Sequence, residues 1–278
     1  MKIEKYEGMD MPKFAISPPA KKGIAKVSEA SKLMWEKGWA ERNGGNVSVN
    51  LTGLVKVPRE LKGYRHVEAA GYPKEAAGMV FFSKRTGERI RDLVLPKEGG
   101  CIVRMDDRAK GYHVLWEGPD IKGGHVTSEF LSHVMIHLQN RKVNNSYRAV
   151  VHTHPTELLA LSHHPRYNKD EALLNETLWS MLPEVRAFTP RGVALTPYTL
   201  PGSKELALLT ARGLAQRDVV LWGKHGAIAS GPGALEAFDY IDVANKGATV
   251  FLKCLESGFT PEGMSKKEME ELARAFKL

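Results

Sequence analysis

A short apolar run that ends in two histidines and a proline constrains the fold more than any other feature of the chain. Ala149–Val151 has the composition of a buried strand, and His152 and His154 follow at alternate positions. Alternate side chains of a strand share a face and lie about 7 Å apart, so both imidazoles can reach one cation at about 2.0–2.1 Å. Pro155 ends the strand and leaves the rings at an edge of the sheet. The segment predicts a metal site, with two ordinary polar residues at a strand end as the alternative.

A third histidine has the same placement. His225 lies between Lys224 and Gly226, shortly after Asp218–Trp222, which has the composition of a buried strand. Three histidines from two strand ends, with the fourth position open, are typical of a catalytic zinc site. His113 is a competing candidate, but it lies within an expected strand, where a packed or hydrogen-bonded ring is expected. His163 and His164 follow a helix and are expected to be exposed.

An acidic residue and a glycine-rich turn are candidates for further chemistry. Glu129 opens a helix expected over residues 128–140, where backbone N–H groups and the helix dipole favour anions. The alternative is that Thr127 or Ser128 caps this helix and Glu129 merely occupies its first turn. Asn43-Gly44-Gly45-Asn46 predicts a turn, and its amides and flexible glycines could also cradle a phosphate.

Composition limits the class of protein. The chain has 278 residues, 42% of them hydrophobic, which is enough for one large α/β domain. Only two cysteines are present, which favours a reducing, cytoplasmic compartment, and no run approaches the ~20 apolar residues of a membrane span. The net charge of +8 comes from scattered lysines and arginines, so we expect no nucleic-acid partner and no membrane partner. A phosphorylated small molecule suits this modest positive excess.

Hydrophobic periodicity predicts alternating helices and short strands. We expect a single domain over residues 1–278, with residues 1–20 as an N-terminal arm, and a mixed sheet covered by helices on both faces. Val47 and Val49 alternate with polar residues, which predicts a half-buried strand. Further strands are expected near 78–83, 100–105, 112–117, 184–190 and 193–199, and helices over 23–41, 156 onward, 170–182, 203 onward, 233–256 and 265 onward.

Five segments together resemble the class II, zinc-dependent sugar-phosphate aldolases in order and approximate spacing. They are Trp39-Ala40-Glu41-Arg42-Asn43-Gly44-Gly45-Asn46, Gly111-Tyr112-His113-Val114-Leu115-Trp116, Thr127-Ser128-Glu129, His152-Thr153-His154-Pro155 and Trp222-Gly223-Lys224-His225-Gly226. The resemblance runs from about residue 20 to the C-terminus. It implies the class II aldolase/adducin-like α/β fold, with a central mixed, largely antiparallel sheet.

The resemblance also implies roles for particular residues. It implies one zinc ion (Zn²⁺) per subunit, bound by His152, His154 and His225, with Glu129 moving a proton. It implies a phosphate pocket built from Asn43, Gly44, Asn46, Thr127 and Ser128. The phosphate loop of the family usually reads Thr-Gly-Ser-Gly, whereas this chain has Ser83-Lys84-Arg85-Thr86-Gly87. Ser83 is the expected equivalent of the serine, and either Lys84 or Gly87 is its partner.

The resemblance extends to quaternary structure and substrate. It implies a homotetramer in which Glu184 reaches the site of a neighbouring subunit. The length and the first two segments favour the branch that cleaves L-rhamnulose 1-phosphate to dihydroxyacetone phosphate and L-lactaldehyde. The alternatives are L-fuculose-phosphate aldolase, ribulose-phosphate 4-epimerase, methylthioribulose-phosphate dehydratase and a non-catalytic adducin-like binding module.

Overall fold

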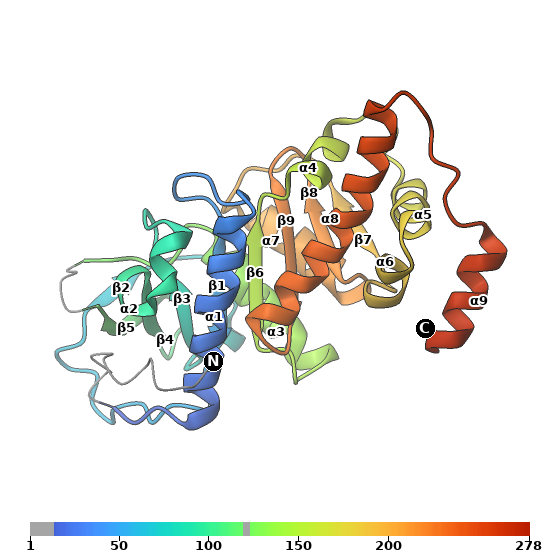
Figure 1. Cartoon of the computed structure of the whole chain (residues 1–278). Helices are drawn as coiled ribbons and strands as arrows, with labels where there is room; N and C mark the ends of the chain where they lie inside the picture. Colours follow the sequence, from blue (N-terminus) through green and yellow to red (C-terminus); the bar gives the residue numbers. More distant parts are fainter. Residues whose placement is uncertain (1–13, 119–122) are drawn as a thin grey trace.

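A computed structural model describes residues 14–118 and 123–278 of the chain (Figure 1). Most of the expected N-terminal arm, residues 1–13, lies outside the described residues. Helix α1, Pro18–Glu36, begins five residues earlier than expected and ends five residues earlier. Ser17 caps it by accepting a hydrogen bond from the backbone N–H of Ala20 at 3.4 Å. Proline suits the first helical position, where an N–H would have no partner in the helix.

One nine-stranded sheet runs through the described residues, in the order β2-β5-β4-β3-β1-β6-β9-β8-β7. Among the described pairs, β7 and β8 are parallel and the others are antiparallel, which confirms the predicted mixed, largely antiparallel sheet. The strands are β1 Asn46–Asn50, β2 His66–Glu68, β3 Val80–Lys84, β4 Gly100–Met105, β5 Gly111–Glu117, β6 Ala149–Thr153, β7 Val193–Thr196, β8 Val219–Trp222 and β9 Gly226–Gly231. Strands β2 and β9 were not predicted.

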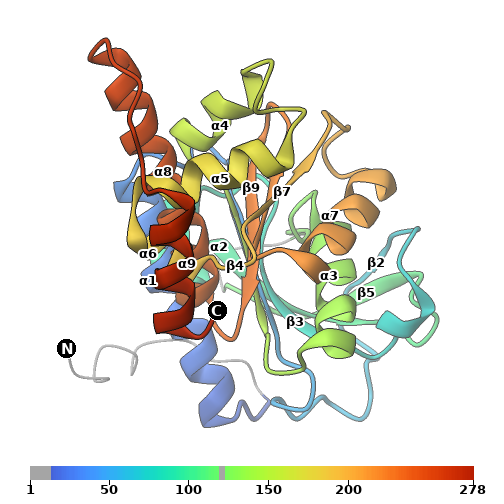
Figure 2. The ribbon, with the colours of Figure 1, turned by 90° about the vertical axis from the view of Figure 1, so that its right-hand side faces the viewer.

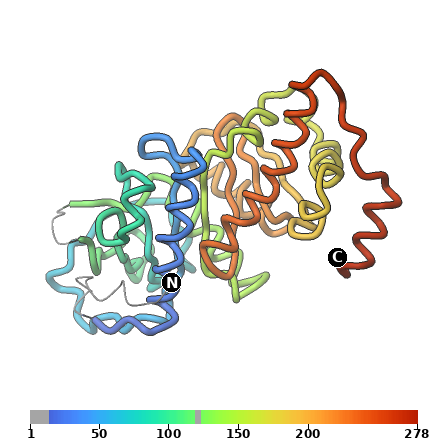
Figure 3. Tube along the Cα trace, in the orientation of Figure 1, coloured from blue at the N-terminus to red at the C-terminus, as the bar shows by residue number. Residues whose placement is uncertain are grey.

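Helices cover both faces of the sheet, as predicted. Figure 2 shows α1, α5, α6 and α8 on one side and α3 and α7 on the other. Besides α1, the helices are α2 Pro96–Gly99, α3 Phe130–Val143, α4 Thr156–His163, α5 Glu171–Met181, α6 Pro183–Phe188, α7 Lys204–Gln216, α8 Ala234–Glu256 and α9 Lys266–Phe276, with 3₁₀ helices η2 Lys74–Ala76 and η3 Ile90–Val94. The terminal helix α9 packs against α6 at the far edge of the fold (Figure 3).

Coverage on both faces explains the continuous apolar run of β6. Ala149 and Val151 belong to the core that includes α1 and α8, whereas Val150 belongs to the smaller core that includes α3 and α7. A strand buried on both faces needs apolar residues at every position. His152 lies on the same face as Val150, and its ring centroid is 4.4 Å from that of Trp222.

Two local predictions are wrong. Residues 184–190, expected as a strand, form helix α6 and its end. Pro183 occupies the first position of this helix, and Val185 is buried close to Gly247 of α8, where an added Cβ atom would lie 3.3 Å from Cγ2 of Val185. Tertiary packing therefore overrides the short apolar alternation. Strand β1, expected to be half-buried, is buried at all five positions because α3 covers its polar face. No helix within the described ranges is both long and apolar enough to span a membrane.

Candidate active site

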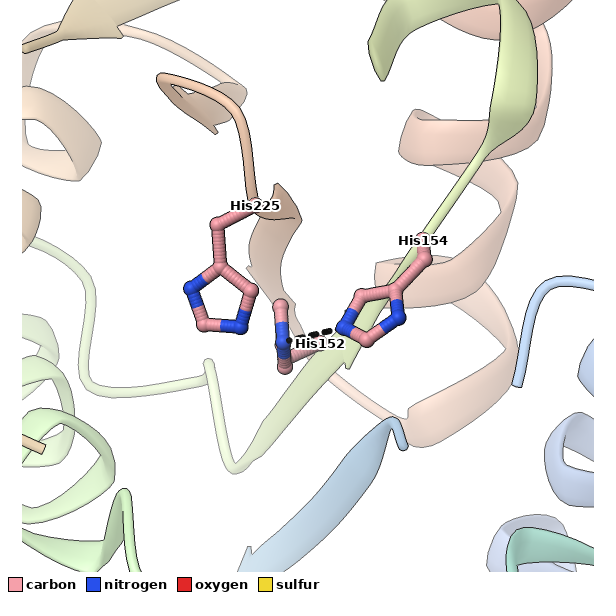
Figure 4. A group of neighbouring side chains, drawn as sticks. All are labelled: His152, His154 and His225. Carbon is pink, nitrogen blue, oxygen red and sulfur yellow. Dashed lines mark hydrogen bonds between the residues drawn. The ribbon is translucent and has the colours of Figure 1, made fainter. Parts of the chain in front are cut away.

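The three histidines lie together at one end of neighbouring strands. His152 is near the end of β6, His154 follows that strand directly, and His225 lies in the turn that connects β8 with β9. Strands β6 and β9 are antiparallel neighbours, so the turn before β9 lies beside the end of β6. Figure 4 shows the three rings converging on a common space, as the sequence predicts.

The spacing of the ring nitrogens fits a single cation. The ligand atoms of the three histidines all lie within 4.8 Å of one another. The Nε2 atoms of His152 and His154 are 3.2 Å apart. Two nitrogens bound to one tetrahedral ion at about 2.0–2.1 Å are about 3.3 Å apart. The cluster therefore has the donor set and the spacing of a three-histidine metal site.

Hydrogen bonds orient two of these rings for metal binding. The Nδ1 atom of His152 donates to the carbonyl oxygen of Ala227 at 2.9 Å, and Nδ1 of His154 donates to Oε1 of Glu41 at 2.6 Å. Each bond leaves the Nε2 lone pair free for a cation. Burial lowers the pKa of His152 well below its usual value and that of His225 to about 4. At pH 7 both rings are therefore neutral, which is the form that binds metal.

Backbone geometry aims His225 at the other two rings. Lys224 has φ 63, a left-handed conformation that costs a side-chain-bearing residue about 1–2 kcal/mol. Its N–H donates to the hydroxyl of Ser162 at 2.9 Å, which helps to hold this turn. A Cβ atom at Gly226 would lie 2.7 Å from Cδ2 of His154 and 3.0 Å from Cε1 of His152. Only glycine at this position lets the turn approach both rings.

Glu129 lies beside the histidine cluster. Its two carboxylate oxygens are each 3.5 Å from a ring nitrogen, one from Nε2 of His152 and the other from Nε2 of His225. It precedes α3 without capping it by its side chain, so it is not simply a helix cap. Burial raises the pKa of Glu129, and the hydrogen bond from Asn46 and the charge of Lys84 oppose that rise. A carboxylate here can exchange a proton with a molecule bound at the cation position.

A cleft extends from the histidines and contains most of the predicted phosphate residues. Its lining consists of Asn43, Gly44, Gly45, Asn46, Lys84, Thr86, Gly87, Thr127, Ser128, Glu129, His152, His154, Pro201 and His225. A Cβ atom at Gly44 would lie 3.0 Å from Cε1 of His154, so the glycine-rich turn packs directly against the histidine cluster. The cleft therefore joins a candidate metal site to a loop rich in hydrogen-bond donors.

The structure does not bring Ser83 to this cleft. Ser83 is fully buried, and its hydroxyl donates to the carbonyl oxygen of Lys84 at 3.0 Å. Lys84 and Gly87, which the sequence left as alternative partners, both line the cleft together with Thr86. The N–H of Thr127 donates to the carbonyl oxygen of Lys84 at 2.9 Å, which places the end of β3 beside the segment that carries Glu129.

Lys84 is a buried cation that was not predicted as a site residue in its own right. It is 2% exposed, and its Nζ donates to the carbonyl oxygen of Asn43 at 2.9 Å. Burial lowers the pKa of Lys84 to about 8, although Glu88 and Glu129 favour the charged form. The ammonium group has three N–H donors, so it can bind an anion in the cleft and Asn43 at once. The sequence signal was weak, because a lysine at the end of a strand is usually exposed.

The remaining candidates lie elsewhere. His113 is on β5, and its ring lies against that of His66 at a centroid distance of 4.8 Å, outside the cleft. His163 and His164 are exposed, as expected. Glu184 is exposed in the first turn of α6 and does not line the cleft of its own chain. Sequence reasoning missed His133 and His137 of α3, which lie behind Glu129; their spacing of four residues on one helix was an available signal.

Comparison with known proteins agrees with this arrangement. The family model described as "Class II Aldolase and Adducin N-terminal domain" matches residues 25–252. The chain belongs to this class II aldolase and adducin family. The histidine cluster and Glu129 thus lie within the matched part of a class II aldolase chain.

Individual members of the class II aldolase family are similar over most of their length. A rhamnulose-1-phosphate aldolase of Bacteroides thetaiotaomicron is 40% identical over 264 residues, which cover 94% of this chain and 96% of the relative. A rhamnulose-1-phosphate aldolase of Mannheimia succiniciproducens is 34% identical and covers 89% of this chain and 92% of the relative. A sugar-phosphate aldolase from Thermotoga maritima has a crystal structure that matches with a TM-score of 0.73 at 31% identity, covering 87% of this chain and 99% of that one.

Proposed function

We propose that the protein is a zinc-dependent lyase that reversibly cleaves L-rhamnulose 1-phosphate to dihydroxyacetone phosphate and L-lactaldehyde. One observation carries the proposal: the Glu129 carboxylate lies 3.5 Å from ring nitrogens of two of the three converging histidines. A base beside a metal site, next to a cleft suited to phosphate, is what aldol chemistry on a ketose phosphate needs. The names of the relatives above favour rhamnulose as the sugar.

The phosphate of the substrate binds at the end of the cleft away from the histidines. Asn43, Thr86 and Ser128 line the cleft and can donate hydrogen bonds to the phosphate, and Lys84 adds a positive charge. Ser83, which the resemblance implied, supports the loop from behind by its hydrogen bond to the Lys84 carbonyl. Holding the phosphate there orients the distant reacting carbon toward Glu129.

His152, His154 and His225 would hold the zinc ion, which would supply a Lewis acid for the negative charge that develops on the substrate oxygens. Glu129 moves the proton in this scheme. When the bond between the two fragments breaks, the electron pair stays with the dihydroxyacetone phosphate carbon, and the carboxyl group of Glu129 delivers a proton to that carbon. In the reverse direction, the carboxylate removes this proton. The aldehyde fragment forms as its hydroxyl group gives a proton to the Glu184 carboxylate of a neighbouring subunit.

A neighbouring subunit contributes the group that acts on the aldehyde. Glu184 is exposed on α6, and Phe188, one turn further along this helix, is 57% exposed. An exposed aromatic beside a carboxylate suits a surface that another copy of the chain covers. We therefore assign Glu184 to the site of an adjacent subunit in a homotetramer. The two free cysteines are consistent with a cytoplasmic location.

Product analysis tests the proposal. The purified, zinc-loaded protein is incubated with L-rhamnulose 1-phosphate, L-fuculose 1-phosphate and L-ribulose 5-phosphate, and the products are identified by mass spectrometry. We expect dihydroxyacetone phosphate and L-lactaldehyde from the first substrate at the highest kcat/KM. Preferred cleavage of the fuculose ester, or epimerisation without cleavage, would move the chain to another branch of the family. No turnover of any ester would favour the adducin-like binding module.

A further inference from the structure

A continuous row of polar side chains runs from Glu129 into the interior, away from the cleft. Asn46 donates from Nδ2 to Oε2 of Glu129 at 2.7 Å, and its Oδ1 contacts Nε2 of His133. The hydroxyl of Ser48 lies 2.8 Å from Nδ1 of His133 and 2.8 Å from Nε2 of His137. All five side chains are buried. The row joins the polar face of β1 to α3 and ends on the candidate proton-transfer residue.

The carboxylate fixes the direction of these hydrogen bonds from one end. Asn46 presents its NH₂ group to Oε2 of Glu129 and its oxygen to Nε2 of His133. Burial lowers the pKa of His133 and of His137 to about 3, so each ring is neutral and carries one N–H. His133 must then donate from Nε2 and accept at Nδ1. Ser48 in turn donates to His133 and accepts from Nε2 of His137.

The other end of the row requires the same direction independently. Nδ1 of His137 is buried and has no hydrogen-bond partner among the described residues. In the direction above, this atom is a bare acceptor. In the reverse direction it would be a buried N–H without an acceptor, which is rarer in native proteins. The packing around His137 therefore selects the same proton arrangement as the carboxylate of Glu129.

We propose that Ser48, His133 and His137 are positioning residues that act on Glu129 through the amide of Asn46. The row prevents the amide from turning over, since a turned amide would place its oxygen against the carboxylate and its NH₂ group against the N–H of His133. Glu129 is thus held at its place beside His152 and His225 by a bond from the interior. Both polar groups of Asn46 are engaged in this way, and Asn46 also lines the cleft. The kinetic consequence, though not the hydrogen-bond direction, rests on the aldolase function proposed above.

Kinetics of four variants test the positioning role. Ser48→Ala and His133→Leu break the row, and we expect kcat to fall about 10- to 100-fold, as for outer-shell partners of metal sites, with zinc content and KM nearly unchanged. Ser132→Ala is the matched control, because Ser132 is fully buried on α3 and its hydroxyl has no partner among the described residues. It removes the same atom outside the row and should leave kcat as it is. His133→Gln can restore a donor near the Nε2 position and should recover most of the loss.

Histidine tautomers test the row without any assay of activity. In protein with ¹⁵N-labelled histidine, two-bond ¹H–¹⁵N correlation spectra should show His133 and His137 as neutral Nε2–H tautomers, assigned by loss of the signals in His133→Gln and His137→Gln. An Nδ1–H tautomer at His133 would overturn the proposal, and so would equal kcat values in folded Ser48→Ala and Ser132→Ala. If the wild-type protein cleaved no ketose phosphate while the tautomers were as expected, the proposed function would fail and the row would stand.

Discussion

Replacing Lys84 by methionine should stabilise the folded protein and weaken binding of the substrate's phosphate group. The side chain is 2% exposed, and burial lowers its pKa from 10.5 to about 8. That difference corresponds to about 3 kcal/mol of lost stability at neutral pH, at about 1.36 kcal/mol for each pKa unit. The substitution also removes the hydrogen bond to the carbonyl oxygen of Asn43, which offsets about 1–3 kcal/mol of the gain. We expect a net gain of about 1 kcal/mol at pH 7.

The effect of Lys84 on the stability of the folded protein depends on pH. The pKa of Lys84 is lower in the folded protein than in the unfolded chain. Burial of the charge therefore destabilises the folded protein by its full amount below pH 8, where both states carry the proton. This destabilisation disappears as the pH rises from about 8 toward 10.5, where both states lose the proton. The stability of the wild-type protein should therefore approach that of Lys84→Met as the pH rises through this window and then exceed it, because the wild type keeps the hydrogen bond to Asn43.

Urea unfolding at about pH 7 and about pH 9.5 measures the effect, with Lys62→Met as the control. Lys62 is exposed, so this control removes the same charge without relieving burial. In parallel, loss of a charge-assisted hydrogen bond worth about 1.5–3 kcal/mol should raise KM for L-rhamnulose 1-phosphate about 10- to 100-fold. If Lys84→Met were destabilised equally at both pH values and kept the wild-type KM, Lys84 would be a structural partner of Glu129 and not a phosphate ligand.

Three further predictions concern the metal site and the proton transfers. Gly226→Ala should bind zinc more weakly, because the added Cβ would lie 2.7 Å from His154 and 3.0 Å from His152. Elemental analysis after dialysis measures the zinc content. Full zinc content would contradict the requirement for glycine at this position. Glu129→Gln should keep zinc and fold but lose about 100- to 10,000-fold in the exchange of dihydroxyacetone phosphate protons with solvent; wild-type exchange would remove Glu129 from the mechanism. Glu184→Ala should slow cleavage and leave that exchange intact, and mixed oligomers of Glu184→Ala and Glu129→Ala chains should regain activity. No recovery in mixtures shown to exchange subunits would refute a site shared between subunits.

The sequence by itself determined the elements that carry the histidines. The apolar run before His152, the proline after His154 and the buried strand before His225 are local signals, and the structure has a strand at both places. Helix α3 also begins beside Glu129 as its apolar stripe predicts. Such features depend on periodicity and on residues that end strands, which act over a few positions of the chain.

Only the tertiary structure decided what lies opposite each face. Periodicity showed that Ser48 shares a face of β1 with Asn46, but burial of that face depends on helix α3, which lies more than 80 residues away in the sequence. The same reason applies to Lys84, whose ammonium group is bound by the carbonyl oxygen of Asn43. It applies also to Ser83, whose hydroxyl donates to the Lys84 carbonyl and does not reach the cleft. A sequence pattern specifies the direction of a side chain relative to its own backbone, whereas its partners come from segments that the fold brings together.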